Sequence, residues 1–423
     1  MSDARSAAAS RRVGGFLLLA AQLALLLGVF HVFELEGRTF RFVAAAAFGA
    51  FALHYWLPFR WKEPFLVLVS MAAAPLLLQP ATGYALLLAG TGLFLICALP
   101  APYRVRVALA SAYFTVAIAA RGLGFLGVPE QFWPVFGGIF GLRALGYLYD
   151  LQRVKGRPDP VAFGAYFFQL PNYCFLFYPV VDYETMRKTW YRRDIHAIAQ
   201  EGVQWITRGV VQLLLYRLLY HELLPPSTPD AIASPAKLVQ VIVVTYLLYL
   251  RLSGQFHIIV GMLHLFGYDL PETHRRYLLA SSLTDFWRRI NIYWKDFMVK
   301  LVYFPVVFRL RRSGDLRAQI VATVAVFSVT WLLHGYVKYW WSPSWPFNVP
   351  DALFWGVLGL LVIVNVVLES RSPRARSSPG LGARLLHGAK VAATFAFISF
   401  LWYLWQRPTL GDWLELITWW QIG

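Results

Sequence analysis

The chain has 423 residues, of which 58% are hydrophobic, 17% aromatic and only 14% charged, and its mean hydropathy is +0.52. Soluble domains usually carry about 25% charged residues, so this composition excludes an ordinary soluble protein, and its hydrophobicity excludes a disordered one. The 39 Lys and Arg outnumber the 22 Asp and Glu. They lie between apolar segments, which indicates membrane loops rather than a surface that binds nucleic acid.

Apolar segments long enough to cross a bilayer follow one another along the chain. The first, residues 13–33, is too long for the apolar part of a signal peptide, and no small-residue cleavage site follows it. We therefore predict an all-α membrane protein with about eleven transmembrane helices. The predicted spans are residues 13–33, 40–59, 64–80, 83–100, 107–128, 132–149, 203–224, 231–251, 317–336, 351–369 and 387–405.

Basic residues alternate between successive loops, and they favour the cytoplasmic side of a membrane. The loops at 60–62, 104–106 and 153–157 are basic, whereas the intervening loops are poor in Lys and Arg. This alternation predicts a cytoplasmic N-terminus, and it also puts the basic loop 370–385 in the cytoplasm. The expected location is the cell's inner membrane. Segment 161–180 lies between two basic clusters and contains two prolines, so we predict a re-entrant element there.

Neither the cysteines nor the histidines form a recognisable metal motif. Cys97 and Cys174 both lie in apolar stretches and are expected to be small buried hydrophobic residues. His257 and His264 are seven positions apart and share a helix face, but no Cys/His motif supplies further ligands. We therefore predict no metal site. Walker, HExxH, GxSxG and dinucleotide motifs are also absent from the sequence.

Residues 269–298 are unusually dense in charged and aromatic side chains for a membrane protein. Read as one helix, residues 285–298 place charged groups on one side and aromatic groups on the other, which predicts an amphipathic helix in the membrane interface. Asn291 interrupts the apolar side. On spacing alone we favour a structural role, in which its amide bonds a neighbouring backbone group.

His334 lies near the end of the predicted span 317–336, where ionisable residues are rare and usually face an internal cavity. A neutral imidazole can take a proton from a hydroxyl or thiol, so His334 is a candidate general base. A histidine bonded at the membrane interface is the alternative. Gly335 beside it allows another chain or a ligand to approach closely.

These segments resemble the membrane-bound O-acyltransferase family, and within it the branch of the alginate O-acetylation proteins. The resemblance covers residues 161–365, in order and with similar spacing. It is carried by FFQLPNYCFLFYPVVDYETM (167–186), the Ser253–Gly254 pair, the Leu270–Pro271–Glu272 turn, the Tyr277–Leu278 pair, SSLTDFWRR (281–289), LVYFPV (301–306), TWLLHGY (330–336) and FWG (354–356).

The resemblance implies helices around a central tunnel, with interfacial and re-entrant segments. His334 matches the family's catalytic histidine. Asn291 matches the position that holds His in the polysaccharide branch and Asn in several lipid-acylating branches. Two positions depart from the family pattern, because Leu333 replaces the usual Trp before the catalytic histidine, and His257 replaces the usual acidic residue after Ser-Gly.

The resemblance also implies a function, namely transfer of an acyl group, possibly acetyl, from a cytoplasmic thioester such as acyl-CoA to a hydroxyl acceptor. His334 is the expected general base, and Asn291 is expected to orient the substrate or to bond the oxyanion. The remaining substrate-binding candidates are Arg288, Arg289 and Lys295 for the CoA phosphates, Trp287 for the acyl passage, and Ser253 with the Gln255–Phe256 pair. For the three cations, anionic lipid headgroups are an alternative, and Trp287 is expected to pack.

Three segments follow from this interpretation: N-terminal transmembrane helices at 1–160, a catalytic core at 161–365, and a basic loop with the last transmembrane helix at 366–423. The acceptor is expected to be an extracytoplasmic glycan reached through a partner transferase. A lipid or small hydrophobic alcohol is the alternative acceptor, and a non-enzymatic transporter or flippase is the alternative function. No resident cofactor is expected beyond the acyl thioester, and the other partners are membrane lipids, with no nucleic acid.

Overall fold

The computed structural model describes residues 2–153, 157–173, 178–226, 232, 234–371 and 380–418. Across these ranges the chain is built from helices, and the one extended pairing is an isolated antiparallel bridge between Trp190 and Tyr268. The predicted all-α class is therefore confirmed. Cys97 is buried and free, as expected, whereas Cys174 and residues 372–379 of the predicted loop 370–385 lie outside the described residues.

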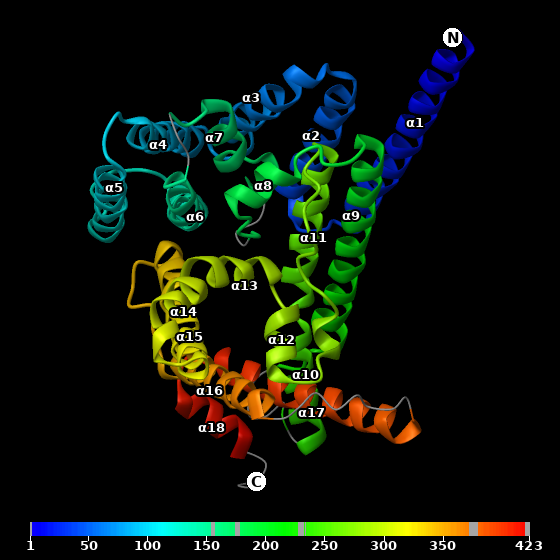
Figure 1. Cartoon of the computed structure of the whole chain (residues 1–423). Coiled ribbons are helices and arrows are strands. Elements are labelled where there is room, and N and C mark those ends of the chain that lie inside the picture. The colour runs from blue at the N-terminus through cyan, green and yellow to red at the C-terminus, as the bar shows by residue number, and fades with distance from the viewer. Residues whose placement is uncertain are drawn as a thin grey trace. The chain divides into compact units, whose positions relative to one another are not determined.

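The helices form two compact units (Figure 1). Unit 1 comprises residues 1–211 and 254–271, and unit 2 comprises residues 212–253 and 272–423. Unit 1 contains α1 (Ser2–Val32), α2 (Gly37–Trp56), α3 (Phe59–Leu77), α4 (Pro80–Ala98), α5 (Tyr103–Leu123), the π-helical η1 (Pro134–Phe140), α6 (Gly141–Leu151), α7 (Pro160–Phe167), the 3-10 turn η2 (Leu170–Tyr173), α8 (Tyr183–Thr189) and most of α9 (Ile195–Leu218) and α11 (Leu250–Leu265).

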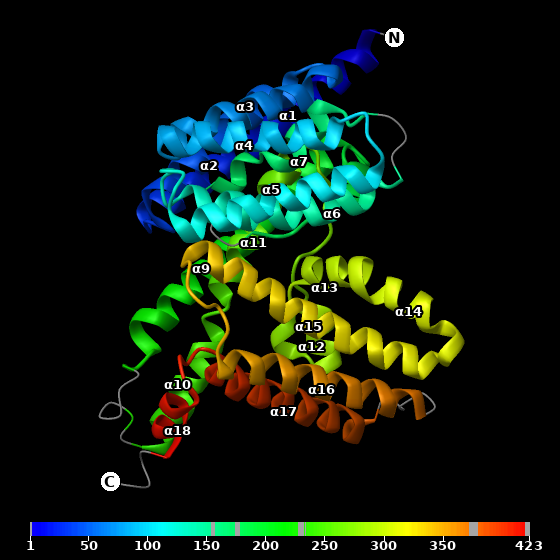
Figure 2. The same cartoon turned by 90° about the vertical axis from the view of Figure 1, so that its left-hand side faces the viewer.

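Unit 2 holds the remaining helices. These are η3 (Leu219–Leu223), α10 (Pro235–Leu247), η5 (Tyr277–Leu279), α12 (Leu283–Arg289), α13 (Ile292–Met298), η6 (Val299–Tyr303), α14 (Phe304–Leu310), η7 (Arg311–Ser313), α15 (Asp315–Trp341), α16 (Val349–Arg371), α17 (Leu381–Trp405) and α18 (Leu410–Thr418). Within this unit, α15, α16 and α17 lie side by side in that order (Figures 1 and 2). An aromatic core fills the space around them.

In unit 1, α9 and α11 contact each other at positions where both helices carry glycine. A Cβ atom added at Gly202 would lie 2.7 Å from the carbonyl oxygen of Gly261, and one added at Gly209 would lie 2.5 Å from that of Gly254. Only glycine allows two helix backbones to come this close, and small residues are the usual contact between helices in lipid. The seven-residue spacing of each pair keeps both contacts on one helix face.

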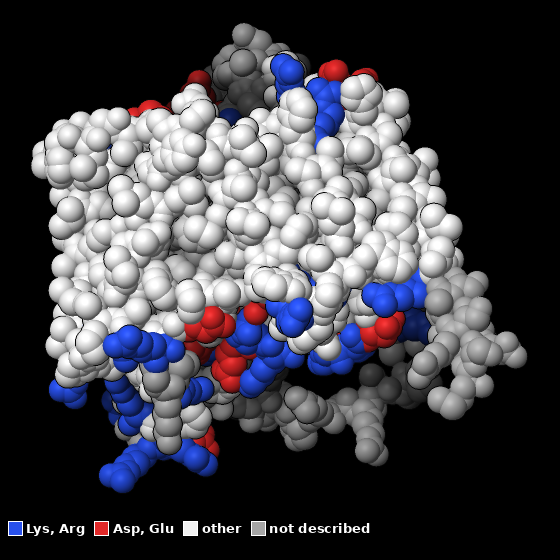
Figure 3. All heavy atoms as spheres, turned by 90° about the horizontal axis from the view of Figure 1, so that it is seen from above, with Lys and Arg blue, Asp and Glu red and all other residues white. Residues whose placement is uncertain are grey.

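Seven helices are long and apolar enough to cross a membrane, counted over the described residues. They are Arg12–Val32, Pro80–Ala98, Tyr103–Leu123, Pro235–Leu265, Asp315–Trp341, Val349–Leu368 and Leu381–Trp405. The other predicted spans fall on α2, α3, η1 with α6, and α9, which are helical but shorter or less uniformly apolar. On the face shown in Figure 3, charged side chains gather toward two opposite margins and leave a broad uncharged belt between them. This is the surface of a multi-pass membrane protein.

The continuous helix predicted for 285–298 is wrong. The chain forms two short helices instead, α12 and α13, which are separated at Ile290 and Asn291. Ile290 is extended and Asn291 has a left-handed backbone with φ 41°. Apolar residues recur at helical spacing on both sides of Ile290 and Asn291, so the pattern of apolar residues does not reveal the break between the two helices.

Candidate active site around His334

His334 lies on α15, in the half of the helix that follows Thr330. Its Nδ1 is 2.8 Å from the carbonyl oxygen of Thr330. Because a carbonyl oxygen only accepts, Nδ1 must carry the proton, which leaves Nε2 as the acceptor on the other edge of the ring. His264 makes the same bond to Val260 at 2.8 Å, but its side chain is fully buried, whereas His334 is half-buried. His334 therefore differs from His264 in the exposure of its side chain and not in this hydrogen bond.

Tryptophans from three helices surround the His334 ring. The ring centroids of Trp294 on α13, Trp355 on α16 and Trp405 on α17 lie 5.4, 4.6 and 6.1 Å from that of His334. Trp405 also stacks on Phe354 at 4.4 Å, with the two rings 13° from parallel. These contacts fix the orientation of the imidazole and keep its surroundings apolar.

Asp351 holds this aromatic array together, although the sequence did not single it out. Its side chain is fully buried. One carboxylate oxygen accepts from Trp331 Nε1 at 2.9 Å, and the other accepts from Trp405 Nε1 at 2.6 Å and from Lys338 Nζ at 3.0 Å. Thus one carboxylate joins α15, α16 and α17 beside His334. In the sequence, a lone Asp at the start of a span is easily taken for an interfacial residue.

Asn291 has the structural role that its spacing favoured. Its Oδ1 accepts from the backbone N–H of Trp294 at 3.3 Å and so caps α13. The indole Nε1 of Trp294 in turn donates to Thr330 Oγ1 at 3.3 Å, and the Trp294 ring contacts His334. The structure therefore connects Asn291 with His334 through Trp294 and records no direct hydrogen bond between the two among the described residues.

The predicted phosphate-binding cations differ in their surroundings. Arg289 Nε donates to Asp285 Oδ1 at 2.7 Å, and Lys295 Nζ lies 2.7 Å from Asp296 Oδ1. Burial alone would raise the pKa of Asp285, but hydrogen bonds from Ser281 and Arg289 outweigh it and hold that pKa below its ordinary value. Arg289 is thus engaged in an ion pair along α12, whereas Arg288 is exposed.

The other predicted substrate-binding residues lie in packed surroundings. Trp287 packs against Phe327, with ring centroids 4.8 Å apart. Ser253 is fully buried, and its Oγ lies 3.2 Å from the hydroxyl of Tyr277 in unit 2. Gln255 and the buried Phe256 belong to unit 1, where Gln255 Nε2 donates to a carboxylate oxygen of Glu36 at 3.0 Å.

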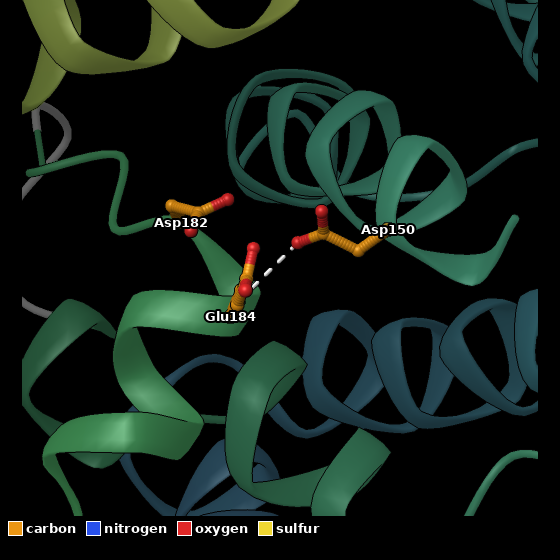
Figure 4. A group of neighbouring side chains, drawn as sticks. All are labelled: Asp150, Asp182 and Glu184. Carbon is orange, nitrogen blue, oxygen red and sulfur yellow. Dashed lines mark hydrogen bonds between the residues drawn. The ribbon is translucent and has the colours of Figure 1, made fainter. Parts of the chain in front are cut away.

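The described residues of unit 1 include a group of carboxylates that the sequence did not indicate. Oxygen atoms of Asp150 on α6 and of Asp182 and Glu184 at the start of α8 lie within 4.8 Å of one another (Figure 4). Two of these side chains already accept backbone N–H groups, since Asp150 Oδ2 is 3.3 Å from Glu184 N and Asp182 Oδ2 is 3.0 Å from Thr185 N. They join α6 to α8 and cap α8, so we assign no metal to them.

The two histidines considered as metal ligands pack within unit 1. The ring of His257 stacks on Trp205 at 5.1 Å, with the planes 15° apart, and His264 is buried and bonded to Val260. Both side chains therefore have packing roles.

No known family model matches this sequence, and no curated protein matches it significantly. The likeness of residues 161–365 to the membrane-bound O-acyltransferases therefore stays a prediction from motifs.

Proposed function

We propose that the protein is a membrane-bound O-acyltransferase that moves an acyl group, possibly acetyl, from a cytoplasmic thioester such as acyl-CoA to a hydroxyl. The observation that carries the proposal is the state of His334. Its Nδ1 is fixed by the Thr330 carbonyl, so Nε2 is the proton acceptor, and the ring stays half-buried among tryptophans. A neutral, oriented and desolvated imidazole is what a general base for a hydroxyl requires.

In this reaction the acceptor oxygen attacks the carbonyl carbon of the thioester while its proton passes to His334 Nε2. The tetrahedral intermediate then loses the C–S bond, and the leaving thiolate takes up the proton from His334. The proton that His334 receives is the one that it returns, so the enzyme ends in its starting state. Asp351 acts as a positioning residue, because it holds Trp331 and Trp405 beside the histidine.

We take the acceptor to be an extracytoplasmic glycan, in a protein of the inner membrane with a cytoplasmic N-terminus. Support for the glycan comes from the likeness of residues 253–289 to the alginate branch. Several lipid-acylating branches carry Asn at the position of Asn291, but a residue that caps α13 is explained by the backbone and carries no argument about the acceptor.

The proposal is tested with purified protein in phospholipid nanodiscs, supplied with acetyl-CoA or palmitoyl-CoA and an alcohol acceptor. Release of the free CoA thiol is measured. Replacing His334 with Gln should lower the release by about 10²–10⁴-fold, the usual contribution of a general base. Binding of the thioester should change little, because a base acts in the transition state.

His387→Gln is the matched control, since His387 is an exposed histidine on another apolar helix, α17. It should keep wild-type release. Equal release by His334→Gln and the wild type, or no thiol release by the wild type with either thioester, would contradict the proposed function.

A further inference from the structure

The indole N–H groups around His334 are not equally satisfied. Trp294 Nε1 donates to Thr330 Oγ1, and Trp331 and Trp405 both donate to Asp351. Trp355 Nε1 has no acceptor in the part of the chain that the structure describes, although the side chain is only 7% exposed. Of the four tryptophans, Trp355 also has the ring with the shortest recorded distance to His334, 4.6 Å.

A buried donor without an acceptor has a cost. Shielding an N–H group from water without a partner destabilises a protein, and most buried donors in folded proteins therefore have an acceptor. Here the donor lies beside the candidate base, in apolar surroundings where a hydrogen bond to developing charge is strongest. Trp294, Trp331 and Trp405 all have acceptors, so Trp355 differs from its neighbours in this array. Trp205 and Trp413 also have buried indole N–H groups without an acceptor among the described residues, but neither ring has a recorded contact with His334.

We infer that Trp355 Nε1 donates to the carbonyl oxygen of the acyl thioester and stabilises the oxyanion that forms on it. This inference rests on the proposed function. As the acceptor oxygen bonds to the carbonyl carbon, the C=O electron pair moves onto the oxygen, opposite the N–H of Trp355, while the hydroxyl proton goes to His334 Nε2. When the C–S bond breaks, the pair returns to the carbonyl.

The assignment replaces the oxyanion role predicted for Asn291, whose side-chain oxygen accepts the backbone N–H of Trp294 and caps α13. Trp355 belongs to the FWG segment at 354–356. Gly356 follows it, and a Cβ atom there would meet nothing within 4 Å.

Trp355→Phe tests the inference, because it keeps an aromatic ring and removes the N–H group. We expect kcat for thioester turnover to fall by about 10²-fold, as for the loss of one oxyanion donor, with KM nearly unchanged. Thermal stability in nanodiscs should stay the same or increase, since an unpaired buried donor has been replaced by an apolar edge. Trp405→Phe is the matched control, and it should lose stability because Asp351 loses a donor.

A second measurement does not depend on turnover. A ketone analogue of acyl-CoA, with CH₂ in place of sulfur and a ¹³C-labelled carbonyl, is bound to each protein and its C=O stretching frequency is recorded. The frequency should be lower in the wild type than in Trp355→Phe. If Trp355→Phe does not fold, 3-benzothienylalanine at position 355 keeps the shape of indole without the N–H.

The assignment of Trp355 would be overturned if Trp355→Phe, or the protein with 3-benzothienylalanine at position 355, kept the wild-type kcat. An unchanged carbonyl frequency in Trp355→Phe would overturn it as well. Either result would leave the proposed function standing as long as His334→Gln is inactive. Activity in His334→Gln would instead remove the proposed function itself.

Discussion

Each unit contains a charged side chain with an exposed fraction of 1% or less, Arg143 in unit 1 and Asp351 in unit 2, and the two charges are satisfied in different ways. In unit 1, Arg143 is 1% exposed and donates to the main-chain carbonyl of Tyr166 at 2.6 Å and to the side-chain oxygen of Gln169 at 2.7 Å. In unit 2, Asp351 is 0% exposed and accepts from two indoles and one ammonium group.

Arg143 supports the backbone at the end of a helix, whereas Asp351 positions side chains around the candidate site. Arg143 binds carbonyl groups at the end of α7, where the helix stops before η2 and leaves carbonyls without helical partners. Its positive charge also suits the negative end of a helix. Asp351 binds only side-chain donors, which come from α15 and α17, so it fixes the rings around His334. The following variants test this distinction.

The largest effect is expected for Arg143→Met. Three charge-assisted hydrogen bonds are lost and their acceptors stay buried, at about 1.5–3 kcal/mol for each of the two short bonds, to Tyr166 and Gln169. The free energy of unfolding, measured in detergent with increasing denaturant, should therefore fall by roughly 3–5 kcal/mol. Turnover per folded molecule should be unchanged. Arg153→Met, at an exposed arginine just after α6, should have little effect; a similar loss in both variants would contradict the role given to Arg143.

Asp351→Asn should produce a smaller loss of stability together with a loss of activity. One oxygen acceptor becomes an NH₂ donor that faces other donors, which should cost roughly 2–3 kcal/mol. Lys338 limits the cost, because its side chain is 43% exposed and reaches water. We expect kcat to fall while KM changes little, since the rings beside His334 lose their anchor. Asp315→Asn, at an exposed Asp on α15, is the control. Wild-type kcat in Asp351→Asn would show that the array does not position the histidine.

Gly335→Ala should have a more modest effect. A Cβ atom at this position would lie 2.3 Å from Cε1 of Phe347, so that ring must shift, and overpacking of this kind costs about 1–3 kcal/mol. Phe347 in turn contacts Trp331, with ring centroids 4.9 Å apart. Gly356→Ala is the control, since its Cβ atom would enter open space. Thermal unfolding of both variants decides the matter, and equal melting temperatures would show that Phe347 adapts freely.

The smallest effect is expected at Asp269, a buried carboxylate whose two arginine partners are exposed. Hydrogen bonds from Arg193, and then from Arg192, hold the pKa of Asp269 below its ordinary value of 3.8, although burial acts in the opposite direction. A carboxyl with a lowered folded pKa stabilises the protein above its unfolded pKa, and this stability is lost as the pH falls through the folded value. Because both arginines are largely exposed, the gain is partly screened.

Asp269→Asn should therefore be less stable than the wild type at pH 6, and the difference should shrink as the pH falls below 3.8. Melting temperatures across this range measure it. A difference that grows on acidification would contradict the sign of the linkage.

The sequence predicts the helical class and most of the apolar helices, because composition and span length depend on every residue. It does not predict the break between α12 and α13, which depends on a single backbone conformation at Asn291. Asp351 and Trp355 were also missed as site residues. Their roles arise from hydrogen bonds between helices, or from the absence of one, and neither leaves a periodic pattern in the chain.

The left-handed backbone of Asn291 has a consequence for how this position can vary. Residues with positive φ are uncommon, and Asn, Asp and His are enriched among them. A β-branched or bulky apolar residue would strain the turn whatever its chemistry. The alternation between Asn and His that the resemblance implies at this position is therefore compatible with one unchanged backbone. Exchange of Asn291 for His should therefore leave the turn between α12 and α13 in place and change only the side chain that caps α13.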